Sequence, residues 1–540
     1  MKQSFFATPT LLISIFALAG CASMPQHSEP DNTFNIRSFG ARGDGKHLDS
    51  PAINRTIEAA AAAGGGTVLV PAGTYLSGSI HLKSNIHLVI DTGAIILGAP
   101  QAMNAYDVAE PFAGPAYQDG GHTYFHNSLI WGENLTNVFI TGHGMINGGD
   151  LSRADGREDQ RSGLVGSGRN SSPRGNDGGT NFPPARLRNT NAPAGNPNAP
   201  DRLGNKAIVL KLCKNVLIRD ITIFHGGHFA ILVTGDDNMT IDNVTIDTDR
   251  DGMDIDCCRN TTVSNCRVNS PNDDGICPKS TYALGRPVIE ENVTIVNCQV
   301  SGFEEGTLLD GTMKPSRGRN GRIKLGTESS GGFRNITIAN CTFRNCKGLA
   351  LEEVDGGILE NITINNISMM DVATYPIYIT TGKRDRTPNL TTPSRMKNIL
   401  ISNIVATGVD RQSGIQITGL PEQPIEGLRL ENIRIVYNGG GTTNDAAHPL
   451  AELGTGYPEP RGVTPAYGLF ARHVKDLELA NISLSFANED FRPAIECDDV
   501  SGLEIDNFKA QLADGVAASK FDNVSDLVIR NSPVLEPAKN

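Results

Sequence analysis

A short segment recurs along this chain, and its repetition limits the possible folds more than any other feature. Each copy alternates apolar and polar residues, reaches an Asn or a turn, and then alternates again, which is typical of two short strands joined at a corner. The closest copies start about 22 to 26 residues apart, close to one coil of a parallel β-helix. The copies are NVLIRDITIF (from Asn215), NMTIDNVTID (Asn238), NTTVSNCRVN (Asn260), NVTIVNCQVS (Asn292), NITIANCTFR (Asn335), NITINNISMM (Asn361), NILISNIVAT (after Lys397), GLRLENIRIV (Gly427), DLELANISLS (Asp476), GLEIDNFKAQ (Gly502) and DLVIRNSPVL (Asp526).

Stacked coils explain two other patterns. Strands of successive coils would pair in parallel about 4.8 Å apart, with Val, Ile and Leu in a continuous core and the corner Asn residues stacked as a ladder. The many Asn-x-Thr triplets are then corners, although the same triplet is also a glycosylation acceptor. Cys266, Cys298 and Cys341 each follow an Asn in equivalent copies, which indicates a repeat position and not the spacing of zinc ligands. The sequence predicts an all-β chain folded as a single-stranded parallel β-helix.

One helix is expected, at the N-terminal end of the stack. Pro51 to Ala63 (PAINRTIEAAAAA) has an amphipathic helical pattern and precedes a glycine break and a strand, GGGTVLVPAGTYL. Because the end of a β-helix exposes unpaired backbone groups, we interpret this helix as a short N-terminal cap. The segment from Phe34 to Gly98, notably FGARGDG and GGGTVLVPAGTY, resembles the N-terminus of the pectin-lyase-like β-helix superfamily, which implies a right-handed coil.

The first residues have the pattern of an export signal. Lys2 supplies a positive charge, Leu11 to Leu18 form a short apolar run, and Leu18-Ala19-Gly20-Cys21 resembles a bacterial lipobox that would place a lipid on Cys21. The run is too short to span a bilayer. We expect a lipoprotein signal peptide at 1–21, a polar tether at 22–32 and a catalytic β-helix at 33–540, lipid-anchored in the periplasm or on the cell surface, with the outer membrane as the expected membrane. An ordinary cleaved signal peptide is the alternative.

Residues 150–205 interrupt the repeat. The stretch is rich in Gly, Asn, Pro and Arg and shows no periodicity, so we interpret it as a long loop and not a domain. Two interpretations stay open, a basic flap over an anionic chain and a solvated loop without order. The arginines of its middle part, set against Asp177 alone, are Arg161, Arg169, Arg174, Arg186 and Arg188.

The overall charge bears on which kinds of molecule the protein can bind. A formal net charge of −12 argues against a general nucleic-acid-binding protein. It does not exclude an acidic substrate, because binding depends on the local charge of the site. A stack of coils needs no second chain to complete it, so we expect a monomer.

The densest group of acidic residues lies in two consecutive copies of the repeat. Asp249-Arg250-Asp251-Gly252-Met253-Asp254 is followed by Asn272-Asp273-Asp274-Gly275, and Asp251 and Asp273 are separated by the same number of residues as the copies at Asn238 and Asn260. Coil stacking would put these carboxylates on one face, provided that Asp273 and Asp274 lie at a bend, which Gly275 permits. Like charges so close are costly unless they tune pKa values for acid–base catalysis, as glycoside hydrolysis requires. Asp-rich turns and a calcium site formed by Asp249, Asp251, Asp273 and Asp274 are the alternatives.

The order of these residues resembles glycoside hydrolase family 28, which contains polygalacturonases and rhamnogalacturonan hydrolases. The resemblance covers most of the chain from Phe34 onward and rests on Asp251-Gly252-x-Asp254 and on Asn272-Asp273-Asp274-Gly275-Ile276-Cys277-Pro278-Lys279-Ser280. The family's Asn-Thr-Asp motif falls on Asp249-Arg250-Asp251 and keeps the essential Asp. The resemblance implies that Asp273 is the general acid, that Asp251 and Asp274 activate water, and that the reaction inverts the anomeric centre without a cofactor.

Two motifs depart from the family pattern. The family has Gly-His-Gly one coil after the Asp pair, whereas Gly142-His143-Gly144 precedes the acidic cluster here, so we interpret it as unrelated to the site. Arg322-Ile323-Lys324 matches the letters of the family's Arg-Ile-Lys, whose cations hold a substrate carboxylate. However, the Gly-Thr-Glu and Gly-Gly that follow indicate the coil that normally carries the His, with Asn320 or Arg322 in its place. Glu352 and Glu353 then stand in the usual Arg-Ile-Lys coil.

An acidic pair at that position would repel a galacturonate. Either Arg322 and Lys324 replace the cations from a neighbouring coil, or the sugar bound there is neutral, for which rhamnose is the natural candidate in pectin. This favours a rhamnogalacturonan-type or exo-acting member over a plain endo-polygalacturonase. The expected substrate-binding residues, with no metal ligand among them, are His228, Asp254, Lys279, Arg322, Lys324, Glu328, Glu352 and Glu353.

The sequence thus predicts an inverting hydrolase of a pectic polysaccharide or oligosaccharide, with catalytic residues Asp251, Asp273 and Asp274. Two other classes stay open. A calcium-dependent pectate-type polysaccharide lyase shares the fold, would use Arg or Lys as the base, and could bind its metal at the acidic cluster. A non-catalytic carbohydrate-binding β-helix would expose aromatic platforms, yet Trp131 is the only tryptophan of the chain.

Overall fold

The computed structural model describes residues 32–111, 120–153, 204–453, 455, 458–459 and 462–535. The predicted signal peptide with Cys21, the tether before residue 32, and the five arginines from Arg161 to Arg188 lie outside these residues, so these expectations stay predictions. Within the described part of the chain, no helix is both long and apolar enough to cross a membrane.

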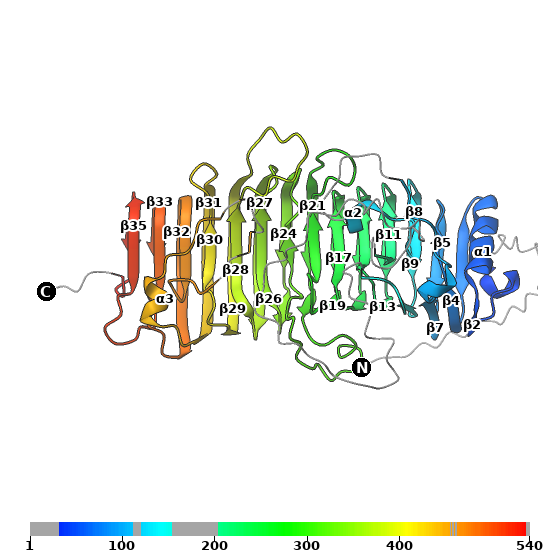
Figure 1. The fold of residues 1–540 in the computed structure, drawn as a ribbon, viewed down its shortest axis with the longest axis horizontal. Helices are drawn as coiled ribbons and strands as arrows, with labels where there is room; N and C mark the ends of the chain where they lie inside the picture. Colours follow the sequence, from blue (N-terminus) through cyan, green and yellow to red (C-terminus); the bar gives the residue numbers. More distant parts are fainter. Residues whose placement is uncertain are drawn as a thin grey trace, which may run out of the picture.

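The chain winds into a stack of parallel strands, as the repeat predicts (Figure 1). A typical coil has three strands, such as β11 (Lys206–Lys211), β12 (Lys214–Arg219) and β13 (Thr222–Phe224). Each strand pairs in parallel with its equivalent one coil later, in β14 (Phe229–Thr234), β15 (Asp237–Asp242) and β16 (Thr245–Asp247). The single-stranded parallel β-helix is therefore confirmed, with three ladders of strands as its faces.

One ladder, which we call the acid face, carries most of the predicted site residues. Ile276 forms a parallel bridge to Ile323, so the ladder continues from the first six strands into the later coils. Its strands are β5 (Ile80–His81), β8 (Ile130–Glu133), β11, β14, β17 (Asp251–Asp256), β20 (Ile276–Lys279), β23 (Lys324–Leu325), β26 (Lys347–Glu353), β28 (Ala373–Thr381), β30 (Ile415–Thr418), β32 (Leu469–Asn488), β33 (Ile495–Asp506) and β35 (Ser519–Ser525).

The other two ladders form the rest of the wall and merge where long strands continue around the corner between them. One contains β1 (Thr33–Asn35), β3 (Gly66–Val70), β6 (Ile86–Ile90), β9 (Thr136–Thr141), β12, β15, β18 (Arg259–Ser264), β21 (Glu290–Val296), β24 (Gly332–Ala339) and β36 (Val528–Arg530). The other contains β2 (Asp44–Leu48), β4 (Gly73–Ser77), β7 (Ala94–Gly98), β10 (Met145–Asn147), β13, β16, β19 (Arg267–Asn269), β22 (Gln299–Ser301), β25 (Thr342–Arg344) and β34 (Lys509–Ala510). The long strands common to both are β27 (Ile358–Met370), β29 (Arg395–Val409), β31 (Ile425–Gly439) and β32.

The core is a set of apolar columns that run along the axis. On the acid face, Ile231, Met253 and Ile276 lie in register on consecutive coils and are fully buried. Because strand residues alternate between faces, their neighbours Leu232 and Asp254 point to the outer side of the same ladder. The inward columns thus fix the register that presents the outward residues of the site.

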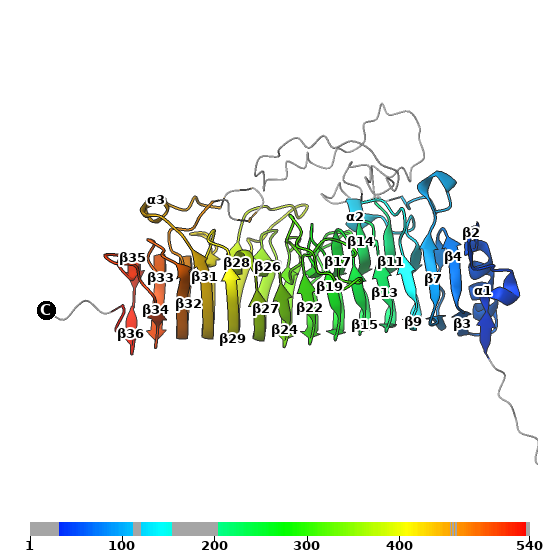
Figure 2. The same ribbon diagram turned by 90° about the horizontal axis from the view of Figure 1, so that it is seen from below.

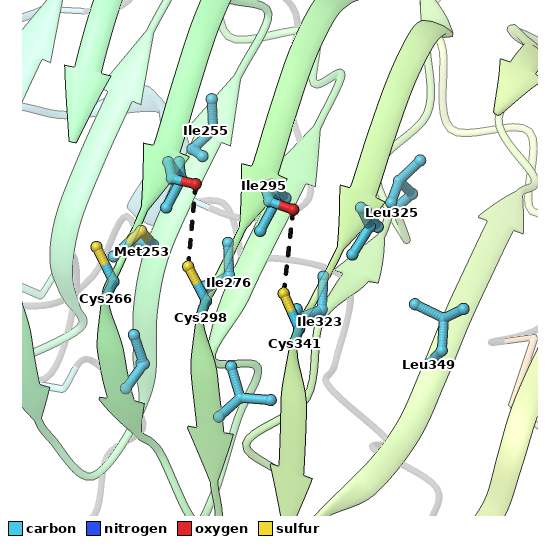
Figure 3. Close-up of a cluster of buried hydrophobic side chains, with 14 of the residues drawn as sticks. Met253, Ile255, Cys266, Ile276, Ile295, Cys298, Ile323, Leu325, Cys341 and Leu349 are labelled. Atoms are coloured by element: carbon cyan, nitrogen blue, oxygen red, sulfur yellow. Dashed lines mark hydrogen bonds between the residues drawn. The ribbon is translucent and has the colours of Figure 1, made fainter. Parts of the chain in front are cut away.

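The cysteine repeat also belongs to this core. Cys266, Cys298 and Cys341 occupy equivalent positions on consecutive coils (Figure 3). The Cys298 Sγ lies 3.9 Å from the Val263 carbonyl, and the Cys341 Sγ lies 4.0 Å from the Ile295 carbonyl, one coil back in each case. All nine cysteines after Cys21 are buried and unbridged, so the pattern marks a repeat position as predicted.

The corner asparagines stack as the repeat predicts. The Asn238 side chain donates to the Asn215 side chain at 2.8 Å, and the Asn361 side chain donates to Asn335 at 3.1 Å. These residues have positive φ, between 53° and 59°, a left-handed conformation that Asn tolerates better than most residues. The Asn-x-Thr triplets are therefore structural corners of the coil.

The predicted cap is α1 (Ser50–Ala62), which covers one end of the stack in Figures 1 and 2. Pro51 lies in its first turn, where the missing N–H costs nothing. Ile53 and Ile57 are fully buried against the first coil. The other helical segments are too short for periodicity to predict: η1 (Ile36–Phe39), η2 (Gln101–Met103), α2 (Gly120–Thr123) and α3 (Thr443–Ala447). In Figure 2, α2 and α3 lie on the same side of the stack.

Candidate active site

The three predicted catalytic carboxylates meet on the acid face. Asp251 begins β17, and Asp273 and Asp274 end the turn that precedes β20. One carboxylate oxygen from each residue lies within 4.8 Å of the others. The parallel register holds them there, since the Gly252 N–H donates to the Asp274 carbonyl at 2.9 Å.

Two glycines allow the coils to approach this closely. A Cβ added to Gly252 would lie 2.4 Å from the Gly275 carbonyl oxygen and 2.3 Å from the Val268 side chain. Neither the backbone oxygen nor the buried Val268 can move away easily. The Asp-Gly pattern of both coils therefore provides backbone clearance next to the acids, in addition to the bend that Gly275 permits.

The three carboxylates differ in their access to solvent. The Asp273 side chain is 30% exposed, whereas those of Asp251 and Asp274 are 3% and 2% exposed. A group that protonates a glycosidic oxygen has to reach the substrate directly. Asp273 is the carboxylate of the three that has this access.

The surroundings of Asp251 and Asp274 shift their pKa values in opposite directions. Burial raises the pKa of Asp251 well above its usual value, and the negative charges of Asp273 and Asp254 raise it further. Burial acts in the same direction on Asp274, but Lys324, Arg322 and Lys279 outweigh it and hold the Asp274 pKa well below its usual value. The cluster therefore combines a carboxyl whose pKa is raised with one whose pKa is lowered, the separation on which acid–base catalysis depends.

Arg322 and Lys324 both bind Asp274. The Arg322 Nε donates to Asp274 Oδ1 at 2.8 Å, and the Lys324 Nζ donates to Oδ2 at 2.9 Å. Both cations are almost completely buried, and Arg322 also donates to Tyr375 and Glu459. These residues are therefore brought to the site as predicted, but they meet a protein carboxylate there.

Glu352 and Glu353, adjacent in β26, have different surroundings. Glu352 is fully buried beside the cations, with its carboxylate 3.8 Å from the Lys324 Nζ and 3.9 Å from the Arg322 guanidinium. Glu353 instead accepts the Gly357 backbone N–H at 3.0 Å. Burial raises the pKa of Glu353 well above its usual value, with a further contribution from Asp355. The structure thus places Glu352 beside Arg322 and Lys324. Glu353, at the end of β26, is instead bound to the turn that follows the strand.

A second ionic group continues from the acids along the outer side of β17 and β20. The Lys279 Nζ lies 2.9 Å from Glu328 and 3.6 Å from Asp254. Arg384 also approaches Glu328, at 3.2 Å. Burial opposes ionisation of Glu328, but Lys279 and Arg384 hold its pKa well below the usual value. Asp254, Lys279 and Glu328 therefore lie together beside the three acids, as the predicted binding set requires.

His228 reaches the acids through a residue that sequence reasoning missed. The Arg250 guanidinium lies 2.9 Å from Asp273, 3.4 Å from Asp251 and 2.6 Å from the His228 ring. Arg250 occupies the middle of Asp249-Arg250-Asp251, where the resembled family has Thr. That departure was visible in the sequence and could have identified the residue.

His122 is a second residue that the sequence did not indicate. It belongs to α2, is fully buried, and lies 3.5 Å from Asp254 and 4.0 Å from Asp256. Phe125 packs beside it on Phe229 of the acid face. No local pattern joins His122 to Asp254, because they lie 132 positions apart in the sequence.

The Gly142-His143-Gly144 motif lies elsewhere, as expected. It forms the exposed turn between β9 and β10, strands of the other two ladders. A Cβ on Gly142 would lie 2.0 Å from the Ile90 carbonyl oxygen. The motif is a tight corner and contributes nothing to the acid face.

The carboxylates could also be considered as a cation site. Asp251, Asp273 and Asp274 each offer an oxygen to a common point. However, Arg322 and Lys324 bind both oxygens of Asp274, and Arg250 binds Asp273. Asp249, the fourth residue of the alternative calcium site, instead pairs with Arg153. The positive charges in contact with these oxygens oppose a divalent cation.

Comparisons with known proteins identify the family of this chain. Residues 33–304 match the family described as rhamnogalacturonase A/epimerase, pectate lyase-like. A "probable polygalacturonase" of Vitis vinifera is 23% identical over 422 residues, which cover 74% of each chain. An exo-poly-α-D-galacturonosidase of Dickeya chrysanthemi is 24% identical over 413 residues, which cover 71% of this chain and 64% of that protein.

A solved structure shows the same fold. The exopolygalacturonase of Thermotoga maritima superposes with a TM-score of 0.59 and 20% identity, over 85% of this chain and 92% of its own. The family match extends over half of the chain and includes the strand and turn that carry Asp251, Asp273 and Asp274. This chain belongs to the rhamnogalacturonase A/epimerase, pectate lyase-like family, among the polygalacturonase-type proteins of glycoside hydrolase family 28.

Proposed function

We propose that this protein is an exo-acting glycoside hydrolase of pectic chains, with a preference for rhamnogalacturonan. The observation that carries the proposal is the cluster of Asp251, Asp273 and Asp274 within 4.8 Å, in which the pKa of Asp251 is raised and that of Asp274 is lowered. The names of the relatives, polygalacturonases and exo-acting galacturonosidases, support a pectic substrate.

In the proposed reaction Asp273 donates a proton to the glycosidic oxygen, because it is the most exposed of the three acids. Asp251 and Asp274 orient a water molecule for attack on the anomeric carbon and accept its proton. Arg322 and Lys324 keep Asp274 ionised throughout. The reaction needs no cofactor.

Exo action is supported by contacts on both sides of the acids. On the N-terminal side, His122 contacts Asp254, and Phe125 packs on Phe229. On the C-terminal side, Glu459 pairs with Arg322 and with Lys347, the latter at 2.6 Å. A long chain that crosses the acids along the stack would have to displace both contacts, whereas a chain end can enter between them.

The preference for rhamnogalacturonan follows from the charges on the C-terminal side. Arg322 and Lys324 bind Asp274, Lys347 binds Glu459, and Glu352 lies behind them. A substrate carboxylate at this position would compete with protein carboxylates for the same cations. A neutral sugar such as rhamnose avoids that competition, which favours the second of the two alternatives left open by Glu352 and Glu353.

A reducing-end assay with resolved product sizes tests the proposal. Protein lacking residues 1–21 is incubated with polygalacturonate and with rhamnogalacturonan, with and without EDTA. We expect short products from a chain end, a faster rate on rhamnogalacturonan and no effect of EDTA. Asp273→Asn should lower kcat by about 10²–10⁴-fold, whereas the same substitution at half-buried Asp237, on β15 and outside the acid cluster, should leave kcat unchanged.

Each alternative has its own outcome in this assay. Unsaturated products that disappear with EDTA would identify a calcium-dependent lyase, and binding without cleavage would identify a carbohydrate-binding protein. Equal or faster cleavage of polygalacturonate would refute the preference for a neutral sugar. Products of intermediate length from the start would refute exo action.

The stereochemical outcome is a separate measurement. The family resemblance implies inversion, but the acids lie within 4.8 Å, nearer to the roughly 5–5.5 Å of retaining enzymes than to the wider spacing of most inverting ones. Proton NMR of the first product should show the anomer opposite to the cleaved bond. Initial formation of the same anomer would mean that one of these carboxylates acts as a nucleophile.

A further inference from the structure

The geometry points to a switch at Arg250, which we propose responds to the substrate's own carboxylate. In the free protein Arg250 is ion-paired with Asp273; when a uronate carboxylate binds Arg250, that contact breaks and Asp273 becomes available as the proton donor. Arg250 is then both a substrate-binding residue and the residue that activates the general acid. This inference rests on the proposed function, because it concerns the acid of the same reaction.

The contacts of Arg250 show why such a switch is needed, because Arg250 binds the carboxylate that has to carry the transferred proton. Its guanidinium lies 2.9 Å from Oδ2 of Asp273, the most exposed of the three acids, and 3.4 Å from Asp251. A guanidinium and a transferable proton compete for the same carboxylate, so Asp273 cannot serve as an acid while this ion pair persists. Some event in the reaction cycle has to separate Arg250 from Asp273.

A substrate carboxylate is suited to cause that event. The Arg250 side chain is 13% exposed, so its guanidinium is at the edge of the site and not deep inside the protein. A guanidinium presents parallel N–H donors that match a carboxylate, and it cannot lose its charge by deprotonation. By contrast, Arg322 and Lys324 are nearly fully buried and bind both oxygens of Asp274. Arg250 is therefore the cation at the acids that an incoming uronate can reach.

In the proposed cycle Asp251 supplies the proton for Asp273, because burial and its acidic neighbours raise the Asp251 pKa well above its usual value. Lys324 and Arg322 instead hold the Asp274 pKa below its usual value. When Arg250 moves to the substrate, the proton passes from Asp251 to Asp273 over no more than 4.8 Å, a distance that one water molecule can bridge. Asp273 then gives it to the glycosidic oxygen as the C–O bond breaks. Water attacks the anomeric carbon and releases a proton to Asp251, which restores the starting state.

His228 supports the guanidinium in its resting position. The His228 ring lies 2.6 Å from Arg250, and its Nδ1 also lies 2.6 Å from the Arg153 carbonyl oxygen. The Arg250 guanidinium also donates to the Arg153 carbonyl oxygen at 3.3 Å, so the backbone oxygen and the His228 ring lie together beside it and limit where the arginine can turn. The predicted binding residue His228 thus acts through Arg250 and does not need to touch the sugar.

The switch predicts that carboxylate recognition and catalysis are coupled. A methyl-esterified uronate cannot draw Arg250 away from Asp273, so it should be turned over slowly even when it is bound. In Arg250→Gln the ion pair is absent and Asp273 needs no release. The variant should therefore lose activity on the free acid but keep or gain activity on the ester.

The test measures kcat and KM for one pectic oligosaccharide in its free-acid and methyl-ester forms. For the unaltered protein we expect kcat on the acid to exceed kcat on the ester by at least about tenfold, the usual effect of losing one charged hydrogen bond. Arg250→Gln should reduce this ratio to about one. Arg250→Lys keeps a cation, so it should retain a preference for the acid. The matched control is Arg259→Gln, an exposed arginine paired with Asp237 at 2.8 Å on β18.

The outcomes separate this inference from the proposed function. If Arg250→Gln lowers kcat equally on both forms, or if it keeps the preference for the acid, the switch is refuted while hydrolysis stands. Loss of activity in Arg250→Lys on both forms, with unchanged circular dichroism, would also refute it. If the unaltered protein cleaves neither form although Asp273 is intact, both the proposed function and the switch are refuted.

Discussion

Aspartates that are equally buried have pKa values shifted in opposite directions. The pKa of Asp274 is lowered because Lys324 and Arg322 contact both of its oxygens. Asp251 is as buried, but burial and its acidic neighbours raise its pKa, with Arg250 only partly opposing them. At Asp236 burial raises the pKa to about 8, and among the described residues only the Cys213 N–H opposes this rise. The residue type therefore decides which groups can titrate, and the contacts of each group decide the pH at which it titrates.

Asp236 offers a direct test of this effect on stability. The unfolded chain releases this proton near pH 4 and the folded chain near pH 8, so the folded state binds more protons between these values and stability falls as pH rises. Asp236→Asn removes the titration and keeps an oxygen for the Cys213 N–H, which Asp236 accepts at 2.7 Å. The variant should gain up to about 1.4 kcal/mol of unfolding free energy per pH unit over this range, relative to the unaltered protein.

Urea unfolding at several pH values between 4 and 8 measures the difference. Asp237→Asn is the control, since Asp237 is the neighbouring residue but lies at the surface and pairs with Arg259. Its unfolding free energy should follow that of the unaltered protein at every pH. If the unfolding free energies of Asp236→Asn and of the unaltered protein change with pH in the same way, the buried carboxyl is not protonated in the folded state.

The strand–corner–strand unit is the element from which the molecule is built. Its corner Asn satisfies two requirements, because it adopts positive φ and its side chain bonds to the corners above and below. Asn335, with a φ of 53°, accepts from Asn361 at 3.1 Å and donates to Asn292 at 3.2 Å. The inward columns fix the register of the strands, and the ladder keeps the corners in line. Together they carry Asp251 and Asp274 to one position on consecutive coils.

Two substitutions at Asn335 separate these requirements. Asn335→Gly removes the ladder bonds but tolerates the left-handed conformation, whereas Asn335→Ala removes the bonds and also strains the backbone. Asn335→Ala should therefore lower the free energy of unfolding by about 1–2 kcal/mol more than Asn335→Gly. Urea unfolding of both variants provides the comparison. Equal losses would mean that the ladder bonds, and not the backbone conformation, explain the preference for Asn.

At the scale of the whole molecule, the stack depends on how its ends are closed. Each inner coil is paired on both sides, but the first coil exposes strand edges that could pair with another chain. In this protein α1 covers that end, and its fully buried Ile53 and Ile57 join the same continuous core as the strands (Figure 1). The helix therefore contributes solubility as well as apolar burial.

Placing charges on the inner side of α1 tests its capping role. The double variant Ile53→Asp, Ile57→Asp should detach the helix, because two unpaired charges cannot stay buried in the core. The uncovered edge should then cause self-association that increases with protein concentration, measured by analytical ultracentrifugation. Ala59→Asp with Ala62→Asp adds the same charge on the less buried side and should remain monomeric. A monomeric Ile53→Asp, Ile57→Asp variant would show that the edge is protected in another way.

The sequence by itself determined the features that depend on local pattern. The repeat predicted the β-helix, the corner ladder and the core cysteines, and the apolar spacing of 51–63 predicted the cap to within one residue. The spacing of Asp251 and Asp273 also predicted that the acids would meet, because the coil length converts sequence distance into a position on the stack. These inferences succeed because each coil depends mainly on its own residues and on its two neighbours.

Only the tertiary structure decided how the acids are charged and what surrounds them. His122 and Glu459 arrive from loops that have no periodicity, so no spacing rule relates them to Asp254 or Arg322. Whether Arg322 and Lys324 face a substrate or a protein carboxylate depends on side-chain direction, and they bind Asp274. Glu352 and Glu353 are adjacent in the sequence but have different contacts, because their side chains point in different directions. Electrostatic energies change over a few ångströms, a scale that is set by three-dimensional contacts and not by the order of residues.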